Sequence, residues 1–143
     1  MKYTIYIDGG SKGNGSAGQE AYGSSKTFKG GIGRSRYHGY GKQRHYHFGN
    51  FTNNEAEYLV LLETLQNLIA AAETGFFDND DIVVIKSDSQ LVVEQVNNRW
   101  KVKDDGLRLL HCRVHDKLSL LSGTVIVAIE KAPRDEVFSV LGH

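Results

Sequence analysis

Two aspartates follow segments that are predicted to be β-strands. Asp8 closes the alternating segment 2–8, KYTIYID, and Asp88 lies near the end of the apolar segment 82–90, IVVIKSDSQ. Alternation predicts a strand, and the continuous β-branched run predicts a central strand covered on both faces. Ligands of open α/β sheets bind at the carboxyl ends of strands. If the two strands are parallel neighbours, both carboxylates emerge at the same edge of the sheet.

A third carboxylate can come from a helix predicted over 52–74. Glu55 and Glu57 lie near the start of this helix, on opposite sides of its apolar stripe, so helical geometry does not choose between them. Neighbouring carboxylates repel unless a cation joins them. Three carboxylates without a Cys/His cluster favour Mg²⁺ or Mn²⁺, and hydrolysis of a phosphodiester by a metal pair is chemistry that such a site supports. From the pattern alone, turn capping by the two aspartates is an equally good interpretation.

The order of the predicted elements indicates an α/β protein with one mixed sheet. A glycine-rich turn over 9–18 follows the first strand, and 19–51 is typical of a β-meander of short aromatic strands. Further helices are expected at 89–98, 103–121 and 134–143, and strands at 82–89 and 124–132. Early antiparallel strands followed by βαβ crossovers predict helices packed on the faces of the sheet.

Length and composition predict one domain over residues 1–143. The 17 basic and 17 acidic residues cancel, yet the meander carries a local basic and aromatic segment. Such a mixture suits a phosphate backbone and stacked bases, although an ordinary solvated sheet face is equally typical. The single Cys112 is expected in or near the core. No leader and no apolar run of about 20 residues is found, so we expect a soluble, cytoplasmic protein.

Four segments resemble type 1 ribonuclease H, and they occur in the order found in that family. They are YIDGGSKGNG at 6–15, TNNEAEY at 52–58, SDSQLVV at 87–93 and KAPRDE at 131–136. The resemblance covers nearly the whole chain and is closest to the short form that lacks the basic protrusion and has an archaeal-like C-terminal motif. It implies the ribonuclease H-like fold, a five-stranded mixed sheet of three antiparallel N-terminal strands plus parallel strands, flanked by helices.

The resemblance also implies an activity and selects one of the two glutamates. The acid of the Ala-Glu-Tyr step is a metal ligand in the family, which favours Glu57 over Glu55. Asp8, Glu57 and Asp88 then match catalytic acids that bind two Mg²⁺ or Mn²⁺ ions, which activate a water and stabilise the leaving 3′ oxygen. The implied reaction is endonucleolytic hydrolysis of the RNA strand of RNA/DNA hybrids.

Four amide side chains match positions that contact substrate in similar enzymes. They are Asn14, Asn53, Asn54 and Gln90. Amides both donate and accept hydrogen bonds, which suits recognition of the 2′-hydroxyl that distinguishes RNA from DNA. The expected partner is therefore an RNA/DNA hybrid. No membrane or protein partner is evident, and a monomer is expected.

The resemblance fails in the last helix, where the family carries a fourth acid. An ungapped match places Leu141 at that position, with Asp135, Glu136 and His143 nearby. Either a shifted helix brings one of those three residues in, or three ligands suffice, or the chain is a non-catalytic module that binds hybrids or double-stranded RNA.

The sequence also does not decide which residues bind the DNA strand, because the family's basic protrusion is not found in it. This binding role can fall to Trp100 with Lys101 and Lys103, to the basic meander, or to both. A core position for Trp100 is equally good.

Overall fold

The computed structural model describes residues 1–11, 20–30 and 37–142. Its five strands are β1 (Lys2–Ser11), β2 (Glu20–Gly30), β3 (Tyr37–Asn50), β4 (Ile82–Ser87) and β5 (Ile126–Lys131). They form one sheet in the order β3-β2-β1-β4-β5. Strands β1, β2 and β3 pair antiparallel, whereas β4 pairs parallel with both β1 and β5. The predicted mixed sheet is confirmed.

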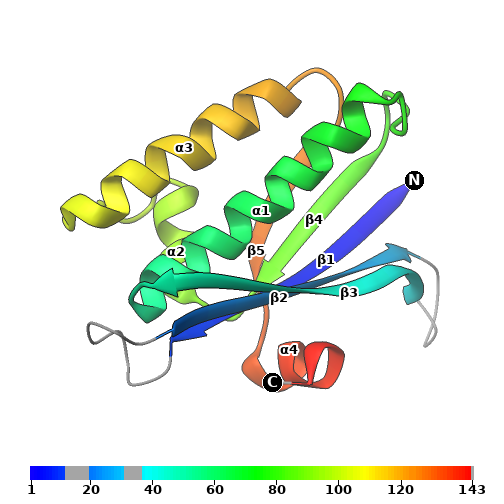
Figure 1. Cartoon of the computed structure of the whole chain (residues 1–143). Helices are drawn as coiled ribbons and strands as arrows, with labels where there is room; N and C mark the ends of the chain where they lie inside the picture. The colour runs from blue at the N-terminus through cyan, green and yellow to red at the C-terminus, as the bar shows by residue number, and fades with distance from the viewer. Residues whose placement is uncertain (12–19, 31–36, 143) are drawn as a thin grey trace.

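In the described ranges, four helices cover the two faces of the sheet unequally. They are α1 (Asn53–Glu73), α2 (Gln90–Val96), α3 (Asp105–Leu121) and α4 (Arg134–Leu141). Helices α1, α2 and α3 lie on one face, and α4 lies on the other (Figure 1). None of the helices in the described ranges combines the length and apolarity that a membrane crossing requires.

Strand β1 divides the core between these faces through its alternating side chains. Tyr3, Ile5 and Ile7 belong to the larger cluster, which α1, α2 and α3 complete. Tyr6 points to the other face and belongs to a small cluster with residues of α4 and the segment before it. Asp8 has the same parity as Tyr6, so its side chain leaves β1 on the face that α4 covers.

The start of α1 is held by a capping box. The Thr52 hydroxyl accepts a hydrogen bond from the Glu55 backbone N–H at 3.1 Å, and the Glu55 carboxylate accepts one from the Thr52 N–H at 2.9 Å. This reciprocal pair satisfies two donors that a helix start leaves unpaired. The Glu55 carboxylate is therefore part of the N-terminal cap of α1. Of the two glutamates, this leaves Glu57 to lie beside the aspartates.

Three expectations from the sequence need correction. Strand β1 does not end at Asp8 but continues to Ser11, because the Asp-Gly-Gly segment still pairs with β2. Cys112 is exposed rather than near the core, since it lies off the buried stripe of α3. Trp100 is 45% exposed, so its core interpretation is wrong.

Gly9 allows α1 to approach β1 closely, and this contact sets the position of Glu57. A Cβ atom at Gly9 would lie 2.6 Å from the Ala56 carbonyl oxygen and 2.9 Å from the Glu57 backbone nitrogen. Real Cβ atoms do not come so near to backbone atoms, so any side chain here would push α1 away from the strand.

We predict that Gly9→Ala destabilises the protein by about 2–3 kcal/mol, because rigid backbone must move to admit the methyl group. Gly10→Ala is the matched control, since the added methyl there meets the end of the Tyr22 side chain, which can rotate. Chemical denaturation of both variants measures the difference. Equal loss of stability in the two variants would contradict the proposed close approach.

Candidate active site

Three carboxylates meet just beyond the point where the parallel pairing of the inner strands β1 and β4 ends. One oxygen from each of Asp8, Glu57 and Asp88 lies within 4.8 Å of the other two. Asp8 is 4% exposed and Glu57 is 9% exposed, so the cluster is largely withdrawn from water. The structure thus brings the three predicted acids together.

Each acid comes from a different element, and local structure explains its place. The parallel pairing of β1 with β4 runs as far as Ile7 and Ser87, so Asp8 and Asp88 each follow the last paired residue. Strand β4 ends at Ser87, and the Ser89 side chain then caps α2 by accepting from the Val92 N–H. Glu57 is in the second turn of α1 and faces the sheet across the contact made at Gly9.

The electrostatic state of Glu57 reflects this crowding. Burial raises the pKa of Glu57 well above its ordinary value, and the charges of Asp8 and Asp88 raise it further. A backbone hydrogen bond from Gly9 and the positive charge of Arg134 lower the pKa in part. Among the described residues, the buried Oε2 atom of Glu57 has no hydrogen-bond partner.

A divalent cation fits this donor set. A buried acceptor that is left unpaired is costly, and a cation bound between the three carboxylates would satisfy it while removing their repulsion. All three side chains offer hard oxygen donors, which is the set that Mg²⁺ and Mn²⁺ prefer.

Arg134, the first residue of α4, contacts the cluster directly. Its guanidinium Nη1 donates a charge-assisted hydrogen bond to Oδ2 of Asp88. The hydrogen bond and charge of Asp88 raise the pKa of Arg134, and Asp8 and Glu57 act in the same direction at longer range. The sequence motif KAPRDE contained this residue, but the motif alone assigned no role to it.

The acids of α4 that were considered as a fourth ligand do not join the cluster. Glu136 accepts a hydrogen bond from the Tyr6 hydroxyl at 2.7 Å and lies 3.7 Å from the Lys86 amine. Asp135 accepts a hydrogen bond from the Glu136 N–H at the helix start. A shifted helix that recruits either of them is therefore excluded in this structure, and His143 lies outside the described residues.

Leu141 fills an apolar position. It is 4% exposed and belongs to the cluster of Tyr6, Ala132 and Val137. Its carbonyl oxygen accepts a hydrogen bond from the Gln43 side chain at 2.9 Å, which ties the end of α4 to β3.

Three of the four predicted substrate-binding amides lie at the starts of α1 and α2, close in sequence to Glu57 and Asp88. The side-chain oxygen of Asn53 accepts a hydrogen bond from the Ser11 N–H at 2.6 Å, which joins the start of α1 to the end of β1. Asn54 and Gln90 are exposed at the starts of α1 and α2. Asn14 lies outside the described residues. The substrate contacts of all four stay predictions.

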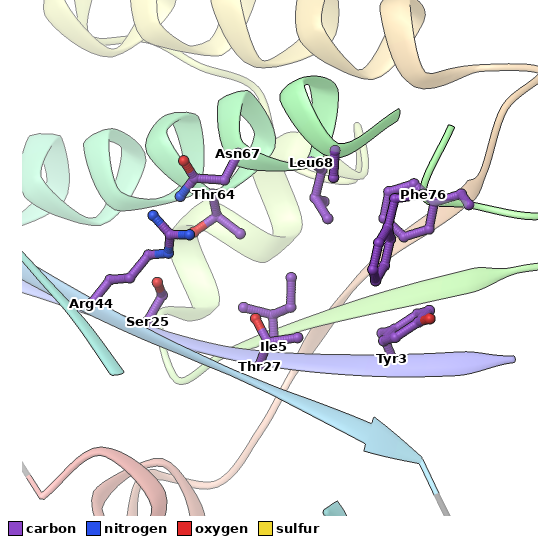
Figure 2. Close-up of a pocket in the computed structure, with 11 residues that line it drawn as sticks. Tyr3, Ile5, Ser25, Thr27, Arg44, Thr64, Asn67, Leu68 and Phe76 are labelled. Carbon is purple, nitrogen blue, oxygen red and sulfur yellow. The ribbon is translucent and has the colours of Figure 1, made fainter. Parts of the chain in front are cut away.

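The basic residues of the meander do not form one face in the described ranges. Lys26 lies on the α4 side of the sheet, in register with Tyr6, and its amine sits 5.4 Å from the centre of the Phe28 ring. Arg44 lies on the α1 side, where it lines a cavity (Figure 2). The predicted basic patch is thus split between opposite faces where its side chains are described.

That cavity is separate from the acidic cluster. It has a volume of about 190 Å³ and lies between the second half of α1 and strands β1 and β2 (Figure 2). Tyr3, Ile5, Leu68 and Phe76 give it an apolar floor and end, and polar groups line the side near Arg44. No carboxylate is among its lining residues, so it offers no alternative place for a divalent metal.

The RNase H family model matches residues 1–119 of the chain. The chain belongs to the RNase H family. The matched range contains all three clustered acids and stops before β5 and α4. The helix in which the family pattern fails therefore lies beyond the matched range.

Curated relatives support the same assignment. Ribonuclease HI of Halobacterium salinarum is 37% identical over 86 residues, which are 60% of this chain and 38% of that protein. A bifunctional protein of Mycobacterium tuberculosis is 35% identical over 111 residues, 78% of this chain and 26% of that protein. The chain thus spans well under half the length of these relatives.

Solved structures share the fold along nearly the whole chain. RNase H1 of Halobacterium salinarum superposes with a TM-score of 0.72 at 27% identity, covering 96% of this chain and 89% of that one. The N-terminal RNase H domain of Rv2228c from Mycobacterium tuberculosis gives a TM-score of 0.68 at 30% identity, covering 96% and 86%. The expected ribonuclease H-like fold is confirmed.

We predict that Glu57→Gln stabilises the metal-free protein at alkaline pH. The pKa of Glu57 is higher in the folded state than its ordinary value of 4.5, so the folded state binds the extra proton. Stability is therefore lost as the pH rises from the unfolded-state pKa through the folded-state pKa. The glutamine removes this loss and should gain about 1 kcal/mol or more at about pH 8.

Thermal unfolding in a chelator, at about pH 4 and pH 8, measures this effect. Glu63→Gln is the matched control, because Glu63 is exposed on the same helix. The expected result is a gain at pH 8 for the Glu57 variant alone. A Glu57 variant that follows the parent protein at both pH values would show that the buried charge carries no such penalty.

Proposed function

We propose that the chain is an endonuclease that hydrolyses the RNA strand of RNA/DNA hybrids in a divalent-metal-dependent reaction. The observation that carries this proposal is the convergence of Asp8, Glu57 and Asp88 at one sheet edge, within a chain of the RNase H family. Phosphodiester hydrolysis needs a nucleophilic water and stabilisation of developing negative charge. A buried set of three carboxylates provides the place for the cation that supplies both.

Asp8, Glu57 and Asp88 would hold Mg²⁺ or Mn²⁺. The bound metal supplies activation of a water for in-line attack and stabilisation of the leaving 3′ oxygen. The three side chains are held by separate elements and are mostly buried, so they need little rearrangement to bind a cation. The resemblance implies two ions, and that number is a prediction.

The amides at the rim of the cluster would provide selectivity for RNA. Asn54 and Gln90 lie in the first turns of two helices whose starts lie beside the acids, and Asn53 is fixed by its bond to Ser11. In this proposal they contact the 2′-hydroxyls and the minor groove of the hybrid, and Asn14, which lies outside the described residues, contributes a further contact. A monomeric state and a cytoplasmic location stay predictions as well.

The alternative is a hybrid-binding module without catalysis, which the missing fourth acid would favour. Incubation of the protein with a labelled RNA/DNA hybrid in Mg²⁺ or Mn²⁺ separates the two. Cleavage of the RNA strand supports the enzyme. Tight binding without cleavage at any metal concentration supports the binding module.

We predict that Asp88→Asn lowers the cleavage rate at least about a hundredfold, because it removes a charged ligand from the metal site. Asp116→Asn is the control, since Asp116 is exposed on α3, away from the cluster. The comparison uses initial rates on the same hybrid, with circular dichroism to verify folding. A fully active Asp88 variant would rule out the proposed site.

The exposed segment between α2 and α3 is the stronger candidate for holding the DNA strand. Trp100 is 45% exposed, and the neighbouring Lys101 and Lys103 are exposed as well. A solvent-facing indole followed by two exposed lysines suits stacking and phosphate contacts. The meander is the weaker candidate, because Lys26 and Arg44 face opposite sides of the sheet.

We predict that Trp100→Ala weakens hybrid binding about tenfold, since stacking of one base on an aromatic ring contributes on the order of 1–3 kcal/mol. The change should raise KM with little effect on kcat. Leu120→Ala is the matched control, because Leu120 is an exposed apolar residue at the opposite end of α3. Unchanged affinity in the Trp100 variant would remove this segment from the interface.

A further inference from the structure

We propose that the guanidinium of Arg134 takes the place of a second metal ion, so that the site holds one divalent ion. This inference rests on the proposed function, because it assumes that the three acids form the metal site. It changes the number of ions that the family resemblance implies. The residues that carry it are the cluster itself and helix α4.

The first support is the contact that Arg134 makes. Its guanidinium binds Asp88, and its charge also acts on Asp8 and Glu57. Asp88 is only 7% exposed in its side chain, whereas the arginine side chain is 72% exposed. A permanent cation thus reaches from solvent onto one of the buried carboxylates of the cluster.

The second support is that α4 is fixed against the sheet, so the contact has a defined position. The Tyr6 hydroxyl donates to Glu136, and Val137 and Leu141 pack in the small core cluster. Arg134, Val137 and Leu141 are spaced i, i+3 and i+7, which places them on one stripe of the helix. The stripe that anchors α4 therefore also directs Arg134 toward the acids.

The third support is the balance of charge. Three carboxylates and one guanidinium leave two net negative charges, which a single divalent ion neutralises. A second divalent ion would meet the arginine at Asp88 and would lack a fourth carboxylate, because Leu141 is apolar and the acids at 135 and 136 are engaged elsewhere. Two cations on one carboxylate repel each other, which disfavours a second divalent ion there.

The test counts metal ions in the substrate-free protein. Mn²⁺ is titrated into the full chain and followed by calorimetry and by the electron paramagnetic resonance signal of free Mn²⁺. The variants are Arg134→Gln, which removes the charge, and Arg134→Lys, which keeps it. Arg108→Gln is the matched control, since Arg108 is an exposed arginine paired with Asp105 on α3. Thermal unfolding without metal verifies that each variant folds.

We expect one ion per chain in the parent protein, in Arg134→Lys and in Arg108→Gln. Arg134→Gln should bind the first ion about tenfold more tightly or more, and it should accept a second ion. Two ions of similar affinity in the parent protein would overturn the proposal, as would an Arg134→Gln variant with unchanged affinity and number of ions.

Failure here is distinguishable from failure of the proposed function. A parent protein that binds metal but leaves the hybrid intact refutes the enzyme and leaves the ion count standing. A parent protein that cleaves the hybrid with two bound ions refutes the role of Arg134 and leaves the enzyme standing.

Discussion

The repulsion between three carboxylates in a mostly buried corner of the sheet is the constraint on which the rest of the site depends. Water screens the charges of Asp8, Glu57 and Asp88 poorly, because two of these residues are nearly inaccessible. The fold would relieve this strain by letting the side chains separate, unless the backbone held them. The cluster therefore exists only because several contacts fix the elements that carry it.

Those contacts concentrate where α1 meets β1. Gly9 lets the helix backbone approach the strand, Asn53 binds the strand end at Ser11, and Thr52 forms the capping box that begins the helix. Each of these contacts positions the backbone of α1 or β1, and the Gly9 N–H also donates a hydrogen bond to the Glu57 carboxylate. Together they fix the height and rotation of the helix, which determines where Glu57 points. The position of one buried carboxylate thus depends on contacts at the start of its helix and on the neighbouring strand.

Much of this arrangement could be predicted from the sequence, because it follows from short-range patterns. The β-branched run before Asp88 and the alternation before Asp8 predicted two strands, and their parallel pairing predicted the meeting of the two acids. Glu55 and Glu57 could not be separated by helical geometry, since both flank the apolar stripe. The structure separates them through the capping box, which depends on the loop before the helix.

The incorrect predictions for the end of β1 and for Cys112 have a common physical origin. The extension of β1 beyond Asp8 depends on pairing with β2, and the exposure of Cys112 depends on which stripe of α3 meets its neighbours. Neither tertiary contact can be predicted from the neighbouring residues in the sequence. The contact between Arg134 and Asp88 could not be predicted from the sequence for the same reason, because the two residues are 46 positions apart.

The leucine at the position of the family's fourth acid has a structural role in helix α4. The helix has only eight residues, and its sheet-facing stripe must supply apolar surface to hold it in place. A carboxylate at position 141 would lie within that buried apolar cluster, where it would lose hydration and weaken the anchor. With leucine there, α4 is anchored more firmly, and the same stripe presents Arg134 one turn before Val137. The apolar stripe that anchors α4 therefore also fixes the position of Arg134 beside the acids.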